Sequence, residues 1–299
     1  MKESRLYHHR LRQYRTGIMF LAPSIIMVLV FALYPMIDTV LLSLHKYNIS
    51  MGVPRQFIGI ENYISLIKDT DFFNAIKVTV IYTFWGVGFT MVFGVILALL
   101  LNREGRISGL LRAVSLMPML ICGAALSVAW TLMYNYSFGL LNAILTAVHL
   151  PKINFLGEVK YALPALITLD IWQFTPFVMI LVLASLKGIP VELYEAASID
   201  GANKVQSFFK ITLPSIRGVL FTTLILRVID TFKTFEKPYM MTNGGPAMTT
   251  NTVNLEVFKT AFSLWNIGYG SAGALIITLL IGLFSITFMK TADIKGGQE

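Results

Sequence analysis

The sequence predicts an all-α integral membrane protein with six transmembrane helices, and three observations support this fold class. Hydrophobic residues make up 56% of the 299 residues, and charged residues only 13%, whereas about a quarter of the residues are charged in ordinary soluble proteins. The mean hydropathy is +0.69. Long apolar stretches recur along the chain, and a helix needs about 20 mostly apolar residues to cross a bilayer.

The six predicted spans are Gly17–Leu44, Ala75–Leu101, Leu110–Tyr134, Leu163–Leu186, Gly218–Phe235 and Tyr269–Met289. The fifth is the weakest, because Arg227 and Asp230 interrupt it and an ionised residue at a helix centre costs about 2.5–3.5 kcal/mol. The first follows a basic start, but it is too long for a signal-peptide core and lacks a small-residue cleavage site, so we expect it to be retained. In the second span, Gly86, Gly88 and Gly94 are expected to permit close helix packing.

The distribution of basic residues predicts the orientation. The two ends of the chain and the loops 102–112 and 187–217 carry 14 Lys and Arg in 67 residues, against nine in 94 for the opposite loops. Cytoplasmic loops carry the basic excess, so we expect both termini and the loop 187–217 to be cytoplasmic. The net charge of +8 then faces an anionic leaflet of membrane lipid rather than nucleic acid.

The expected organisation follows from these spans. It comprises a cytoplasmic basic N-terminal tail (1–16), the first transmembrane helix (17–44), an external loop (45–74), a transmembrane core (75–290) that contains the loop 187–217, and a cytoplasmic C-terminal tail (291–299).

The chemistry-bearing side chains do not form a pattern typical of an enzyme. The single cysteine, Cys122, cannot form an internal disulfide, and the four histidines lack metal-ligand spacing. Serines are scattered without a His/Asp constellation. Gly-Lys-Ser and Gly-Lys-Thr do not occur, so the sequence has no Walker A phosphate-binding loop. We expect no catalytic residue, no metal site and no cofactor bound by this chain.

The loop 187–217 has a distinctive pattern. Gly188 predicts the end of the fourth span, before a short helix over Val191–Ile199. Ala196 and Ala197 in this helix would let another surface approach closely. Gly201 permits a sharp turn. A second amphipathic stretch (203–210) follows, and a proline at 214 marks the start of the fifth span.

This loop resembles that of the membrane-spanning permease subunits of ATP-binding-cassette (ABC) importers. Their signature is Glu-Ala-Ala, three residues, Gly, nine residues, Ile, one residue and Leu-Pro. All seven specified residues occur here at that spacing: Glu195, Ala196, Ala197, Gly201, Ile211, Leu213 and Pro214. The alternative is a surface helical hairpin that binds no partner.

Softer matches extend the resemblance over nearly the whole chain, toward the sugar, glycerol-phosphate and maltose-type branch of the family. They are Ala22-Pro23, Leu33-Tyr34-Pro35, Phe57-Ile58-Gly59, Glu61-Asn62-Tyr63, Ile171-Trp172, Pro176-Phe177, Ile199-Asp200-Gly201-Ala202 and Thr242-Asn243-Gly244-Gly245-Pro246. The Gly-Gly-Pro turn could dock a binding protein or could simply be a turn.

The resemblance implies a type I ABC importer transmembrane fold, with a cytoplasmic coupling helix between helices 4 and 5. It implies a multi-pass permease of a bacterial or archaeal plasma (inner) membrane that pairs with a second homologous permease as a heterodimer. Two cytoplasmic ABC ATPase subunits would use ATP and Mg²⁺, and an extracytoplasmic solute-binding protein would deliver a carbohydrate (a sugar, oligosaccharide or polyol).

The resemblance also assigns roles within the loop. Glu195 would be the charged contact to the ATPase, although it could instead be a solvated helix charge. Ala196, Ala197 and Gly201 would form the close-approach surface. The remaining coupling residues would be Asp200, Ile211, Leu213 and Pro214.

Polar residues within spans are costly and tend to face the bundle interior or a cavity. Asp170, Trp172 and Gln173 in the fourth span are therefore candidate contacts for a sugar, because hydroxyls need polar partners and C–H faces stack on aromatic rings. The alternative is contact between helices together with an interfacial aromatic. Arg227 and Asp230 lie three residues apart on one helical face, so they are either an ion pair, substrate-pathway residues or interfacial.

The alternative function is ion-gradient-driven secondary transport. An ion-gradient-driven secondary transporter would show internal repeats and broken helices at corresponding positions of two halves. No such symmetry is evident, and that function would leave the Glu-Ala-Ala loop unexplained. The sequence therefore favours an ATP-driven importer subunit.

Overall fold

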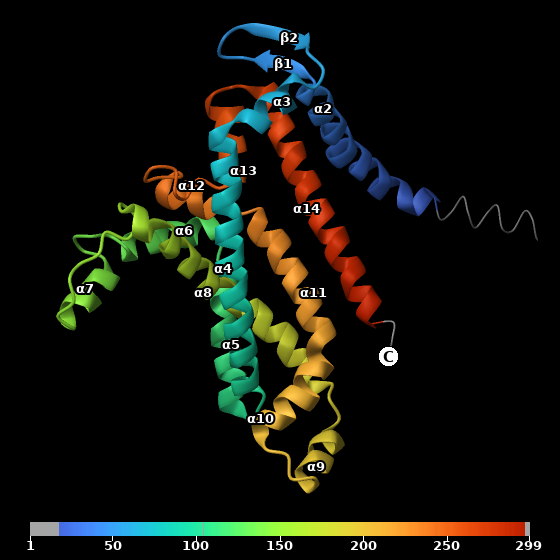
Figure 1. The fold of residues 1–299 in the computed structure, drawn as a ribbon, viewed down its shortest axis with the longest axis vertical. Helices are drawn as coiled ribbons and strands as arrows, with labels where there is room; N and C mark the ends of the chain where they lie inside the picture. The colour runs from blue at the N-terminus through green and yellow to red at the C-terminus, as the bar shows by residue number, and fades with distance from the viewer. Residues whose placement is uncertain (1–17, 104, 297–299) are drawn as a thin grey trace, which may run out of the picture. The chain divides into compact units, whose positions relative to one another are not determined.

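A computed structural model describes residues 18–103 and 105–296 (Figure 1). The predicted N-terminal tail (1–16) and the last three residues of the predicted C-terminal tail lie outside this part. The chain divides into two compact units, one made of 1–68 and 257–276 and the other of 69–256 and 277–299. Each unit is mostly helical, which confirms the predicted fold class.

Five of the described helices are long and apolar enough to cross a membrane: Ile18–Ser43, Thr70–Leu101, Val159–Lys187, Lys204–Phe232 and Ile267–Phe288. A sixth crossing is obtained if the pair Arg106–Leu120 and Gly123–Met133 counts as one. The first helix contains a π-helical turn, η1 (Leu29–Leu33), followed by α2 (Tyr34–Ser43). The last, α14 (Ile267–Gly296), extends beyond the predicted Met289.

In the first unit, the first helix leads into an antiparallel hairpin of β1 (His45–Asn48) and β2 (Val53–Phe57), with His45 opposite Phe57. The following helix, α3 (Glu61–Lys68), secures this hairpin, because the Asn62 amide donates to the carbonyls of Ser43 and His45 at 2.8 and 3.0 Å. Part of the predicted external loop is therefore ordered.

The second unit is built on α4 (Thr70–Leu101) and α8 (Val159–Lys187), which pack along each other. Helix α4 begins five residues before the predicted Ala75, because the Asp69 carboxylate accepts hydrogen bonds from the first-turn N–H groups of Asp71 and Phe72 at 2.9 and 3.2 Å. The remaining helices of this unit include α7 (Leu140–Ala147), α12 (Glu236–Thr242) and the start of α13 (Val253–Phe258).

The prediction of one continuous third span is wrong. The segment forms α5 (Arg106–Leu120) and α6 (Gly123–Met133), bent by 97° at the two residues between them. Pro118 lacks an N–H group and so weakens the last turn of α5. Ile121 and Cys122 then adopt ψ values of 135° and 131°, which are not helical.

The fifth span begins earlier than predicted. Helix α10 (Lys204–Ser207), a π-helical turn η2 (Phe208–Thr212) and α11 (Leu213–Phe232) form one continuous helix, so the predicted amphipathic stretch and the span are not separate. The wide turn precedes Pro214, as η1 precedes Pro35. Because a proline ring clashes with the carbonyl of an ordinary helical turn, a π-helical turn before it lets the helix continue.

The close packing expected of Gly94 is confirmed. A Cβ atom at Gly94 on α4 would overlap with the side chain of Val178 on α8, whereas a Cβ atom at Gly88 would meet nothing within 4 Å. Only one of these two glycines is therefore required by the contact between α4 and α8.

We predict that Gly94→Ala lowers the free energy of unfolding by about 1–3 kcal/mol, since overpacking at a tight contact costs that much. Gly88→Ala is the matched control, because it introduces the same methyl group into the same helix and is expected to be neutral or stabilising by up to about 1 kcal/mol. The measurement is unfolding of each variant in the same detergent. Equal shifts for the two variants would contradict this packing.

Candidate functional site

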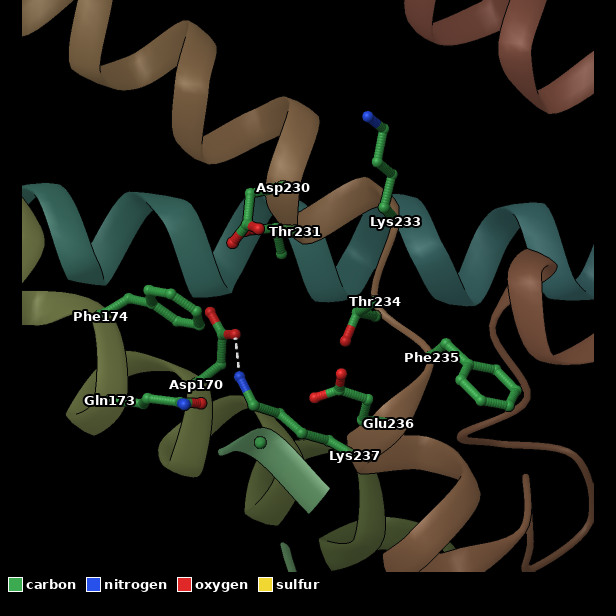
Figure 2. A pocket seen from close by; sticks show the side chains of 11 residues that line it. Asp170, Gln173, Phe174, Asp230, Thr231, Lys233, Thr234, Phe235, Glu236 and Lys237 are labelled. Carbon is green, nitrogen blue, oxygen red and sulfur yellow. Dashed lines mark hydrogen bonds and ion pairs between the residues drawn. The ribbon is translucent and has the colours of Figure 1, made fainter. Parts of the chain in front are cut away.

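A cavity of about 340 Å³ lies in the second unit where α8, α11 and α12 approach the broken third span. Figure 2 shows Asp170 and Gln173 on one side and Glu236 and Lys237 on the other, while the Lys233 side chain extends away from them. The lining residues are Gly123, Asp170, Gln173, Phe174, Asp230, Thr231, Lys233, Thr234, Phe235, Glu236 and Lys237.

Asp170 is the centre of an ion network. Its carboxylate is only 2% exposed. One oxygen, Oδ2, accepts from Arg227 Nη2 at 2.6 Å, and the other, Oδ1, accepts from Lys237 Nζ at 2.5 Å. A buried carboxylate without such partners would cost several kcal/mol. The network therefore joins α8, α11 and α12 at one residue.

Arg227 is itself buried, with 1% of its side chain exposed, and it also donates through Nη1 to Asp230 at 2.7 Å. Its guanidinium lies 4.1 Å from the ring centroid of Phe174, and Lys237 Nζ lies 4.7 Å from the same centroid. Both distances are within the range of cation–π attraction. Two cations therefore share a carboxylate and an aromatic ring.

Three other hydrogen-bond acceptors belong to residues that line the cavity. Asp230 is 56% exposed, and Glu236 is exposed. The Gln173 amide donates to the Ile121 carbonyl at 3.4 Å, while its buried Oε1 has no hydrogen-bond partner within the described ranges. Two exposed carboxylates and one buried amide oxygen thus belong to the lining of the cavity, beside the ion network of Asp170.

The break in the third span shapes this cavity. A Cβ atom at Gly123, the first residue of α6, would overlap with the Glu236 carboxylate. The absence of a side chain at Gly123 therefore lets Glu236 lie against the N-terminus of α6, where the helix dipole favours a negative charge. A straight third helix would not bring a helix N-terminus to this place.

The loop between α8 and α11 forms a second candidate site. Helix α9 spans Val191–Ile199, as predicted. Gly201 has φ +77°, which confirms the predicted sharp turn, and its N–H donates to Ser198 O at 3.1 Å. The N–H of Ala202 donates to Ala197 O at 2.9 Å. These two hydrogen bonds form a Schellman motif, which favours glycine at this position.

The next helix begins immediately with a capping box. The side-chain oxygen Oδ1 of Asn203 accepts from the Gln206 N–H at 2.9 Å, and the Gln206 side-chain oxygen Oε1 accepts from the Asn203 N–H at 2.8 Å. One helix end and one helix start are thus satisfied by local hydrogen bonds. Glu195 and Ala196 are exposed in this turn, and so are Asp200 and Pro214.

Comparison with known proteins decides the family. Residues 90–293 match the family described as "Binding-protein-dependent transport system inner membrane component". The chain belongs to this family. This permease is 36% identical to the trehalose/maltose transport system permease protein MalF of Thermococcus litoralis, over 95% of this chain and 96% of that protein. It is 34% identical to the sulfoquinovosyl glycerol transport system permease protein SmoG of Agrobacterium fabrum, over 93% and 91%.

The fold of the permease is also found in a solved structure, a bacterial ABC transporter involved in the import of the acidic polysaccharide alginate. The TM-score is 0.83 at 22% identity, over 96% of this chain and 98% of that chain. The predicted ABC importer permease is therefore confirmed over the ion-gradient alternative, and the protein is a multi-pass membrane transport subunit.

The structure brings together most of the predicted pathway residues. Asp170, Gln173 and Asp230 line the cavity, and Arg227 lies behind it. Trp172 lies outside the lining and instead contacts Trp130, with ring centroids 5.4 Å apart. A substrate contact of any of these residues stays a prediction.

Some of the predicted coupling residues are less exposed than the others. Ile211 and Leu213 are half-buried in the permease, and the contacts of the coupling residues with an ATPase also stay a prediction. Within 18–103 and 105–296, no group of three or more His, Cys, Asp or Glu side chains is arranged to hold a metal ion.

Sequence reasoning missed Lys237, Glu236 and Phe174. Lys237 follows the end of the predicted fifth span (Gly218–Phe235), but α12 returns it to the interior. One signal could have found it: a carboxylate within a span needs a cation, and Lys237 is among the few lysines near a span end.

We predict that Asp170→Asn lowers the free energy of unfolding of the permease by about 3–5 kcal/mol, because it leaves Arg227 and Lys237 buried without their shared counter-charge. Asp230→Asn is the control, since its half-exposed pair is worth about 1 kcal/mol or less. Thermal unfolding in detergent compares the two. An Asp170→Asn shift no larger than that of the control would contradict the central role of Asp170.

Proposed function

We propose that this permease forms, together with a second, similar permease, the translocation pathway for a carbohydrate (a sugar, oligosaccharide or polyol). An extracytoplasmic solute-binding protein delivers the substrate, and two cytoplasmic ABC ATPase subunits use ATP and Mg²⁺ to drive import. Support for the substrate class comes from the named substrates of the relatives, trehalose/maltose and sulfoquinovosyl glycerol. Support for the external partner comes from a solved alginate transporter in complex with an alginate pentasaccharide-bound periplasmic protein.

One observation carries this proposal: the cavity combines polar acceptors with aromatic rings. Asp230 and Glu236 are exposed acceptors of its lining, Gln173 has a buried Oε1 atom without a described partner, and Phe174 and Phe235 are the aromatic residues of the lining. Carbohydrates present hydroxyl donors around an apolar C–H face, so both kinds of group are needed.

Asp170 has a different role in this proposal. Both of its oxygens are engaged by cations, so it is not a ligand for the sugar but holds the surrounding helices in place. The cavity of about 340 Å³ lies at the lower end of the range for ligand sites, about 300–1,000 Å³. The second permease would supply the opposite wall for a larger sugar.

The coupling function rests on α9. Its Glu195 and Ala196 are exposed, and Ala197 gives it a small side chain that another surface can approach closely. We assign α9 to the cytoplasmic side, where the basic excess lies, and both termini to the same side. This chain would contribute the coupling helix and its partner ATPase the nucleotide site.

We predict that Glu195→Ala weakens association of the purified permease complex with its ATPase by about tenfold or more, because a hydrogen bond to a charged group is worth about 1.5–3 kcal/mol. Membrane insertion should be unchanged, since Glu195 is exposed. Glu192→Ala is the matched control, because Glu192 is an exposed carboxylate on the same helix outside the motif. Association unchanged by Glu195→Ala would contradict the proposed role, and uptake into vesicles without any ATPase would contradict the function.

We also predict that Glu236→Gln raises the KM of uptake by about fivefold. A hydrogen bond from a hydroxyl to a charged acceptor contributes about 1 kcal/mol more binding free energy than one to a neutral acceptor. The carbohydrate is first identified by thermal shift of the solute-binding protein against a panel of sugars and polyols, and its uptake is then measured in proteoliposomes. Trp172→Phe, outside the cavity lining, should leave the KM unchanged. A KM that responds to Trp172→Phe and not to Glu236→Gln would place the substrate elsewhere.

A further inference from the structure

Helix α9 is largely exposed. All of its nine residues are exposed except Tyr194 and Ala197, which are half-buried. Its two ends continue into turns at Gly188 and Gly201. Packing therefore contributes little to holding α9 against the spans.

One hydrogen bond crosses from α9 to the fifth span. Tyr194 Oη lies 2.9 Å from Thr212 Oγ1. Within the part of the chain that the structure describes, no other side-chain hydrogen bond joins α9 to another helix. Thr212 is 5% exposed and Tyr194 is half-buried, so this bond is partly shielded from water. A hydrogen bond is stronger in such a low-dielectric environment than in water.

Thr212 lies at a special place in the backbone. Thr212 ends the π-helical turn η2, directly before Leu213 and Pro214. Because η2 lets the helix continue past the proline, Lys204–Phe232 is one helix. Fifteen residues separate Thr212 from Arg227, which corresponds to about 22 Å at 1.5 Å per residue. Thr212 and Arg227 of the ion network therefore belong to one continuous helix.

We propose that Tyr194 is a positioning residue that makes α9 and α11 move as one unit. This inference rests on the proposed function, in which an ATPase moves α9. Without the Tyr194–Thr212 hydrogen bond, α9 would move about its two glycine-containing turns and the displacement would be lost before α11. Tyr194 thus acts on transport through Thr212 and not through the ATPase surface.

The test measures the distance between α9 and α11 in the complete transporter. Nitroxide labels are placed at Ser198→Cys on α9 and Thr222→Cys on α11, both exposed positions, in a Cys122→Ser background that removes the single native cysteine. Distances are recorded by pulsed electron paramagnetic resonance without nucleotide and after trapping with MgATP and vanadate, so no transported substrate is needed.

In the parent we expect one narrow distance that is the same in both states. Tyr194→Phe keeps the ring and removes the hydroxyl, so on trapping the population should shift about two- to tenfold away from the parent distance, as expected for the loss of one hydrogen bond. Thr212→Val should have the same effect, whereas Thr212→Ser, which keeps a hydroxyl, should behave as the parent. The double variant Tyr194→Phe/Thr212→Val should be no worse than either single variant.

Three results would overturn the proposal. The first is a parent distance that changes on trapping, and the second is a set of variants that keep the parent distribution. The third is loss of ATPase association in Tyr194→Phe, since Tyr194 would then act at the ATPase surface. If the parent permease binds no ATPase at all, the proposed function is overturned instead, because α9 then receives no motion that the Tyr194–Thr212 hydrogen bond could pass to α11.

Discussion

The second unit depends on how one buried carboxylate is neutralised. Asp170 lies within a helix that crosses the apolar region, where an isolated charge is strongly unfavourable. Arg227 and Lys237 each bind one of its oxygens, and they come from different helices, α11 and α12. The position of each helix is therefore set by a requirement for charge balance as well as by packing.

This neutralisation leaves the cavity chemically divided. Arg227 and Lys237 are not available to a ligand, because both are paired with Asp170 and both lie over the ring of Phe174. Asp230 and Glu236 are exposed, and Gln173 keeps a buried oxygen without a described partner. A buried polar atom without a partner costs about 1–3 kcal/mol, and a bound hydroxyl would recover that free energy. The proposed carbohydrate would meet these acceptors through its hydroxyl groups.

The sequence predicted local features well and non-local ones poorly. The bounds of α9 and the turn at Gly201 were correct because a Schellman motif and a capping box are made by residues close in the sequence. The bend of 97° in the third span was missed, since hydropathy does not register the loss of helical hydrogen bonds at Pro118. Lys237 was missed for a different reason: only the tertiary fold shows that α12 returns to Asp170, and apolar periodicity carries no information about that path.

The two sites are linked by the order of residues along α11. The proposed coupling turn precedes it, Thr212 lies at its start, and Arg227 and Asp230 lie in its last turns. A π-helical turn before Pro214 keeps this helix unbroken, whereas a proline within an ordinary helix removes a hydrogen bond and bends it. A bend at Pro214 would let α9 move without moving the ion network. The wide turn is therefore a mechanical requirement of the proposed coupling, and the sequence places the proline of the Leu-Pro motif where that requirement arises.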